Sequence, residues 1–232
     1  MRTQYRNKWV GMAAEMRIPC ENDRISATLR MPADAKSIVL VVGESGCSRF
    51  DPTAISIANK LNEQRIATIL PDLVPPGTLP DSAVADHVAM AKLAARRLEE
   101  ITLQLIADRD VEGMKVGYLG IGVGAAAAAL TAAEIPSSVQ SLVGVCGRMD
   151  LAGKSIKHIK APTLLIAGEA DQQLVWLNQS VCSRLTCEHT FGIIPRSGEE
   201  LTAAGAMDQA AEMAADWFAI HLAPPELVET TV

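Results

Sequence analysis

The chain has 232 residues, of which 49% are hydrophobic and 21% charged, and its formal net charge is −6 at pH 7. This composition is typical of a folded globular protein, and the length suits a single α/β domain. The acidic balance argues against nucleic acid or an anionic membrane as the main partner. An aromatic content of 3% also argues against a surface that stacks on bases.

The five cysteines include no Cys-x-x-Cys pair, which argues against a disulfide framework and against a zinc site. Residues 1–14 form an N-terminal segment whose first nine residues are polar and basic, without the apolar core of a signal peptide, and no apolar run is long enough to span a membrane. We therefore expect a cytoplasmic protein with reduced thiols, no metal, no cofactor, and no nucleic-acid or membrane partner.

The first half of the chain alternates short apolar runs with helical patterns. Residues 15–20 and 24–31 are predicted to form two edge strands, and residues 37–43 a strand buried on both faces. After a loop, Asp51 and Pro52 match the N-cap and first position of a helix that continues to residue 64. A strand over 66–71 and a long helix near 82–108 follow.

The second half begins with a strand, a glycine-dense turn and an alanine-rich helix over residues 115–130. Further strands are predicted over 141–146, 163–167 and 189–194, with helices near 173–185 and 206–221. Strand alternates with helix throughout, which predicts one α/β domain over 15–222 with a mostly parallel sheet of about seven or eight strands and helices on both faces. Residues 223–232 are expected to form a flexible tail.

Four predicted strand ends would meet at one edge of such a sheet, where open α/β sheets bind ligands. They are Gly43 to Arg49, Gly120 to Gly124, Gly168 to Asp171, and Ile194 to Glu199. In this order they resemble the oxyanion loop, nucleophile elbow, acid loop and histidine loop of α/β-hydrolases. Segments such as 66–73, 147–153 and 161–166 resemble more narrowly the small, capless dienelactone hydrolase-like branch, and the resemblance covers roughly residues 15–222.

The resemblance implies a degenerate catalytic triad. The elbow Gly-x-Ser-x-Gly has Gly122 at its middle position, where the family has serine or cysteine. The acid position is kept as Asp171, whereas the position that corresponds to the histidine falls on Glu199. The oxyanion loop and elbow comprise Gly43, Glu44, Ser45 and Val123, and Glu44 would repel a developing oxyanion.

Other residues near this edge could contribute chemistry. Cys47 could serve as a displaced nucleophile, although no histidine is expected beside it. Arg49 and Arg148 could hold an anionic ligand group or pair with nearby aspartates such as Asp72 and Asp150. The carboxylates of Glu44, Asp171 and Glu199 are expected to project toward one cleft, or each toward solvent or an arginine.

Three hypotheses on function follow. The chain could be a non-hydrolytic pseudoenzyme that binds a small molecule or a protein partner in the former active-site cleft. It could be an enzyme of altered mechanism, a weak esterase or lactone hydrolase or a non-hydrolytic acid–base catalyst, acting through Cys47 or the three carboxylates. It could also be a structural subunit of an oligomer, and a homo-oligomer is left open.

Overall fold

A computed structural model of the chain describes residues 12–20, 23–44, 48–74, 84–198 and 201–223. Its centre is an eight-stranded sheet with the order β1-β2-β4-β3-β5-β6-β7-β8. The strands are β1 (Met12–Cys20), β2 (Asp23–Met31), β3 (Ser37–Val42), β4 (Ala67–Pro71), β5 (Lys115–Ile121), β6 (Ser141–Val145), β7 (Thr163–Gly168) and β8 (His189–Ile194). The six strands from β3 to β8 are parallel, and β1 and β2 are antiparallel additions at one edge. The predicted fold class is confirmed.

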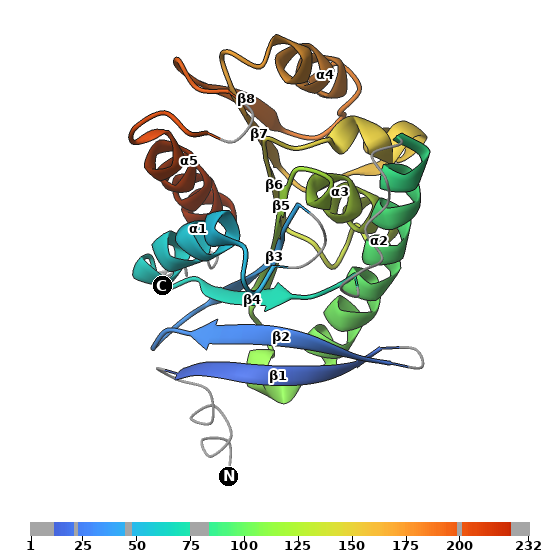
Figure 1. Cartoon of the computed structure of the whole chain (residues 1–232). Helices are drawn as coiled ribbons and strands as arrows, with labels where there is room; N and C mark the ends of the chain where they lie inside the picture. The colour runs from blue at the N-terminus through green and yellow to red at the C-terminus, as the bar shows by residue number, and fades with distance from the viewer. Residues whose placement is uncertain (1–11, 21–22, 45–47, 75–83, 199–200, 224–232) are drawn as a thin grey trace, which may run out of the picture.

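Helices cover both faces of the sheet, as Figure 1 shows. They are α1 (Pro52–Glu63), α2 (Val84–Ala107), α3 (Gly124–Glu134), α4 (Gln172–Cys182) and α5 (Ala206–His221), with two 3₁₀ segments, η1 (Arg109–Val111) and η2 (Met149–His158). In Figure 1, α1 and α5 lie on one face and α2, α3 and α4 on the other. None of the described helices has the length and the apolar character needed to cross a membrane.

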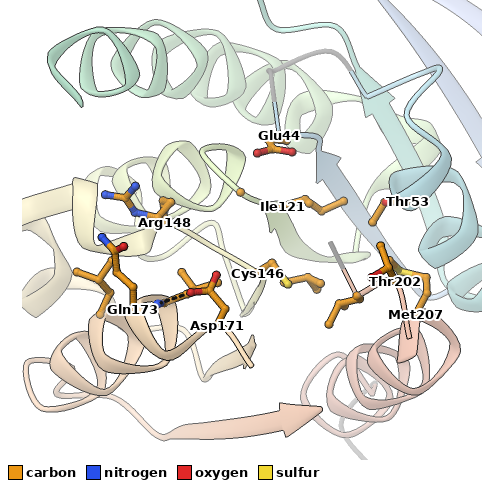
Figure 2. A pocket seen from close by; sticks show the side chains of 14 residues that line it. Glu44, Thr53, Ile121, Cys146, Arg148, Asp171, Gln173, Thr202 and Met207 are labelled. Carbon is orange, nitrogen blue, oxygen red and sulfur yellow. Dashed lines mark hydrogen bonds between the residues drawn. The ribbon is translucent and has the colours of Figure 1, made fainter. Parts of the chain in front are cut away.

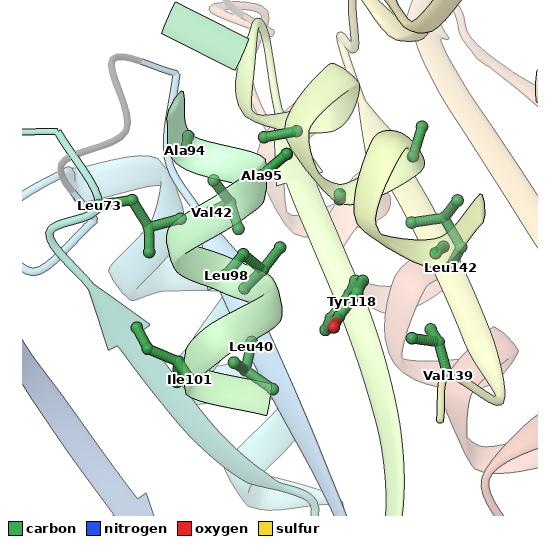
Figure 3. Close-up of a cluster of buried hydrophobic side chains, with 14 of the residues drawn as sticks. Leu40, Val42, Leu73, Ala94, Ala95, Leu98, Ile101, Tyr118, Val139 and Leu142 are labelled. Atoms are coloured by element: carbon green, nitrogen blue, oxygen red, sulfur yellow. The ribbon is translucent and has the colours of Figure 1, made fainter. Parts of the chain in front are cut away.

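The central strands are buried on both faces, which explains their unbroken apolar sequences. Every residue of β3 is buried, as is every residue of β4, β6 and β7. Figure 3 shows the core beneath α2, where Leu98 and Ile101 face Leu40 of β3 and Tyr118 of β5. The Tyr118 hydroxyl lies 2.6 Å from Thr102 Oγ1, which satisfies this polar group inside the core.

The limits of most elements are close to those predicted from the sequence. Asp51 caps α1 through Oδ1, which accepts from the Thr53 N–H at 2.8 Å, and Pro52 is the first helical residue. The first strand, however, begins at Met12, three residues before its predicted start. Its antiparallel pairing with β2 continues as far as Met12 opposite Met31, so cross-strand bonding extends the strand.

Helix α3 packs unusually closely against the sheet because its first two turns carry only small residues. Ala125 to Ala129 are fully buried. At its first residue, a Cβ on Gly124 would lie 2.4 Å from the Val42 carbonyl oxygen and 2.5 Å from that of Gly43. Both contacts are with backbone, which cannot rotate away. This approach places the N-terminus of α3 beside the end of β3.

We predict that Gly124→Ala destabilises the protein by about 2–3 kcal/mol, because the added methyl forces the helix away from β3. Gly198→Ala is the matched control, since a Cβ at Gly198 would meet nothing within 4 Å, and should change stability by less than about 0.5 kcal/mol. Urea unfolding of both variants measures the difference. Equal stability of the two variants would show that α3 does not depend on this approach.

Candidate functional site

The turn between β5 and α3 has the conformation of a sharp strand-to-helix elbow. Gly122 stands at its tip with φ +51°, in the left-handed region that favours glycine. Its N–H donates to the Val145 carbonyl at 3.3 Å, and its own carbonyl accepts from the N–H groups of Arg148 at 2.8 Å and Ala125 at 3.2 Å. The elbow is therefore held by the loop after the neighbouring strand as well as by α3.

The side chain of Glu44 occupies the space beside Gly122 that a side chain at the elbow would need. A Cβ built on Gly122 would lie 2.6 Å from Glu44 Cγ, 3.0 Å from Cδ and 3.1 Å from Oε1. Contacts below 3.0 Å are not tolerated, so a residue larger than glycine at position 122 requires Glu44 to move. A carboxylate thus lies against the elbow tip.

A cavity of about 460 Å³ opens beside this contact at the carboxyl ends of the strands. Figure 2 shows Glu44 on one side of it and Asp171 on the other, with Thr53 and Gln173 at opposite ends. The lining combines polar and apolar side chains and consists of Glu44, Thr53, Ile121, Gly122, Val145, Cys146, Arg148, Asp171, Gln173, Leu174, Leu177, Leu201, Thr202 and Met207. The position is the one expected from the topology of the sheet.

Asp171, at the predicted acid position, forms the N-cap of α4. Its Oδ1 accepts from the Leu174 N–H at 2.9 Å, the bond drawn in Figure 2. This bond satisfies one of the N–H groups that the first turn of a helix leaves without an intrahelical partner. Asp171 therefore both stabilises α4 and presents a carboxylate to the cavity.

The two candidate arginines are each paired with carboxylates. Arg148 forms a bidentate pair with Asp150 of η2, at 2.9 Å and 3.0 Å. Arg49 Nε lies 2.6 Å from Asp72 Oδ2, and the guanidinium also contacts Glu15. The hydrogen bond that Arg49 donates to the Asp72 carboxylate is the main cause that raises the pKa of Arg49. Of these two arginines, only Arg148 lines the cavity.

Several predicted site residues lie outside the described part of the chain, namely Ser45, Cys47 and Glu199. The other oxyanion-loop residues are described. The Gly43 N–H donates to the buried Ser48 Oγ at 2.8 Å, and Val123 is the N-cap residue of α3. All four histidines are described, and none of them lines the cavity.

One cavity residue, Cys146, was not selected from the sequence. It directly follows β6, is 8% exposed, and has φ +45°, a left-handed conformation that is uncommon for a residue with a side chain. The strand-end rule that selected Gly122 and Asp171 applies equally to Cys146 and could have found it. Burial raises the pKa of the thiols of Cys182 and Cys187, which disfavours the reactive thiolate at those two positions.

The described side chains combine two carboxylates, an ion-paired arginine and a thiol. They include no group of three or more His, Cys, Asp or Glu residues with the arrangement of a metal site. Such a set can bind a cation or donate and accept hydrogen bonds. It lacks the nucleophile–imidazole pair on which serine-type hydrolysis depends.

Comparisons with known proteins place this geometry in context. A dienelactone hydrolase from Anabaena variabilis is 31% identical, with a TM-score of 0.83, over 91% of this chain and 99% of that chain. Est1E from Butyrivibrio proteoclasticus is 11% identical with a TM-score of 0.72, over 89% of this chain and 100% of that one. The second likeness concerns the fold alone.

Two curated proteins of Mycobacterium tuberculosis, named as candidate phosphoribosyl transferases, are 33% identical over 201 residues. The match covers 87% of this chain but 45% of each relative, so the chain spans about half the length of the curated relatives it matches. The model of the Dienelactone hydrolase family matches residues 25–181, which is more than half of the chain. On this match and the similarity to the Anabaena enzyme, the chain belongs to the dienelactone hydrolase family.

Proposed function

We propose that this chain is a non-hydrolytic member of its family that binds a small, amine-bearing molecule in the cavity beside Gly122. One observation carries the proposal: the Glu44 side chain packs against the Gly122 elbow, with Cγ 2.6 Å from the place of a Cβ. Gly122 offers no atom that can attack a carbonyl. The carboxylate beside it opposes the negative charge that ester hydrolysis develops.

The missing groups matter because a catalytic triad acts as a unit. In a serine protease, loss of the serine or the histidine alone costs roughly 10⁶ in turnover, about as much as loss of the whole triad. Here the elbow carries glycine and no histidine lines the cavity. The remaining acid, Asp171, has a structural task at the start of α4 that would preserve it without catalysis.

The charges around the cavity favour a cationic ligand. The carboxylates of Glu44 and Asp171 line the cavity, and Arg148, which also lines it, forms an ion pair with Asp150. An ammonium group between the two carboxylates would gain charge-assisted hydrogen bonds. Thr53, Thr202 and Gln173 offer further hydrogen bonds, while Leu177 and Met207 would contact the apolar part of the molecule. The volume, about 460 Å³, lies within the range usual for small-molecule sites.

The transferase name of the mycobacterial relatives does not extend to this proposal. Those proteins are about twice as long as the matched region. The carboxylates of Glu44 and Asp171 would repel a phosphate group, and the guanidinium of Arg148 is already engaged by Asp150. We therefore do not propose phosphoribosyl transfer at this cavity.

A second candidate function is thiol-dependent hydrolysis, which the position of Cys146 in the cavity supports. Cys146 lies in the loop after β6, and in the same loop the backbone N–H of Arg148 donates to the carbonyl of Gly122. The alternatives that use Cys47 or Glu199 stay predictions, because both residues lie outside the described part of the chain. A protein partner in the cleft likewise remains a prediction.

The packing of Glu44 on Gly122 predicts a specific pattern of stability. Gly122→Ala should cost about 2–3 kcal/mol, since the left-handed backbone disfavours a side chain and the methyl collides with Glu44 Cγ. In the Glu44→Ala variant, Gly122→Ala should cost about 1 kcal/mol less, because the collision with Glu44 is gone and only the cost of a side chain on a left-handed backbone remains. Urea unfolding of the four proteins gives this coupling, and additive effects would refute the packing.

The proposal also predicts no turnover of p-nitrophenyl esters or dienelactone above the uncatalysed rate. Cys47→Ala and Cys146→Ala variants identify the source of any activity that does occur. Turnover lost only with Cys146→Ala would support the second candidate, and turnover lost only with Cys47→Ala would support the displaced nucleophile. Turnover that survives both changes would contradict the non-hydrolytic proposal and would also exclude both cysteines as the nucleophile.

Ligand preference is tested with a panel of small primary amines and their N-acetylated counterparts, and their binding is measured by thermal shift and by calorimetry. The free amines should bind more tightly, and Asp171→Asn should weaken them about tenfold, because the amide keeps the N-cap but removes the charge. Asp51→Asn makes the same change at the cap of α1, outside the lining, and serves as control. Absence of any preference for the charged amine would contradict the proposal.

Restoration of the triad provides an independent test. Gly122→Ser with Glu199→His should give little activity, because the new serine meets Glu44 and the oxyanion faces its carboxylate. Adding Glu44→Gly removes both obstacles and should raise ester turnover on the order of 10²-fold. Each single substitution should remain inactive. An inactive but folded triple variant would show that the implied triad positions are incomplete.

A further inference from the structure

The outer edge of β8 is open to pairing with another strand. Among the described strands β8 pairs with β7 alone and ends the sheet. The carbonyls of Glu188 and Ile194 accept from the N–H groups of Thr163 and Glu169, each at 2.9 Å, so the even-numbered residues bond toward β7. Because backbone groups alternate along a strand, the N–H and C=O groups of Phe191 and Ile193 point outward.

The two edges of the sheet differ in how they are protected. The exposed side chains of β1 include Glu15, Arg17 and Pro19, and charge and proline are common means of preventing edge-to-edge pairing. The sequence of β8, His-Thr-Phe-Gly-Ile-Ile, has no proline and no residue that is charged at pH 7 if its histidine is neutral. On a chain of net charge −6, this uncharged edge is a place where two copies can approach.

We propose that two copies of this chain pair antiparallel through β8 and form a homodimer with one continuous sheet. The strand that pairs with β8 belongs to a second copy of the chain, because two β8 edges are complementary to each other when the antiparallel pair is centred on Gly192. There Phe191 lies opposite Ile193 of the partner subunit, and the outward groups of both residues exchange hydrogen bonds. Phe191 is half-buried and Ile193 is 43% exposed, so the aromatic and β-branched side chains are available to pack together.

Charges at the two ends of β8 select the same register. Centring the pair on Gly192 brings Glu188, just before β8 of one copy, toward Arg196 of the other, which lies in the turn after β8 with φ +58°, and the twofold axis repeats the approach. The Glu188 side chain is 65% exposed, although its Oε1 lies 3.7 Å from His221 Nε2, and Arg196 is exposed as well. A shift of the centre by one residue would separate these opposite charges. The dimer is independent of the function proposed for the cavity.

Sedimentation equilibrium on the full chain tests the dimer. The wild type should sediment at twice the mass of one chain, and Ile193→Lys should weaken association by about 100-fold or more by placing like charges near the axis. Ile106→Lys is the matched control, since Ile106 is 44% exposed and lies on α2, which packs against β1 at the opposite edge. This control should leave the dimer intact. A single-chain mass for the wild type at about 100 µM, or a dimer that survives Ile193→Lys, would overturn the proposal.

A charge swap tests the register. Glu188→Arg and Arg196→Glu should each weaken the dimer about tenfold, and the double variant should return to within about threefold of the wild type. Failure of the double variant to recover would overturn the register. Hydrogen exchange of the wild type does not depend on any variant: the amides of Phe191 and Ile193 should exchange slowly in concentrated protein and rapidly on dilution. Rapid exchange at both concentrations would contradict pairing at this edge.

Discussion

The contact between Glu44 and Gly122 is the constraint on which the site depends. The elbow keeps the left-handed backbone of a strand-to-helix turn, with φ +51°, and glycine adopts it at little cost. A Cβ built on Gly122 would lie 2.6 Å from Glu44 Cγ, so the Glu44 side chain crowds the place of any side chain at the elbow. The close approach of α3 to β3 at Gly124 holds the elbow beside the loop after β3, so a side chain at position 122 requires Glu44 to move.

The surrounding residues are consistent with a scaffold whose parts have structural tasks. Asp171 caps α4, Arg148 is paired with Asp150, and Arg49 joins the loop after β3 to the end of β4 through Asp72. None of these interactions requires a reacting substrate. The cavity at the strand ends is lined by the carboxylates of Glu44 and Asp171, which is why we favour a cationic small molecule over an ester or a phosphate.

Much of the fold could be predicted because its signals are local. Unbroken apolar runs marked the parallel strands, the alanine run marked the tightly packed α3, and Asp51-Pro52 marked the start of α1. The site was harder, because its properties depend on pairs that are distant in sequence. A carboxylate at a strand–helix junction is compatible both with an acid position and with an N-cap; Asp171 is the N-cap of α4 and also lines the cavity. The packing of Glu44 on Gly122 is a contact across 78 positions that no local pattern encodes. Cys146, by contrast, follows β6 directly, and the strand-end rule could have selected it.

The most direct test of the central contact is a nuclear Overhauser measurement on the wild-type protein, with Glu44 and Gly122 selectively labelled. We predict strong cross-peaks between the γ-protons of Glu44 and the α-protons of Gly122, because a Cγ placed 2.6 Å from the Cβ position brings these protons close together. Absence of these cross-peaks, with the Glu44 γ-protons instead contacting residues away from the elbow, would contradict the packing of Glu44 against Gly122.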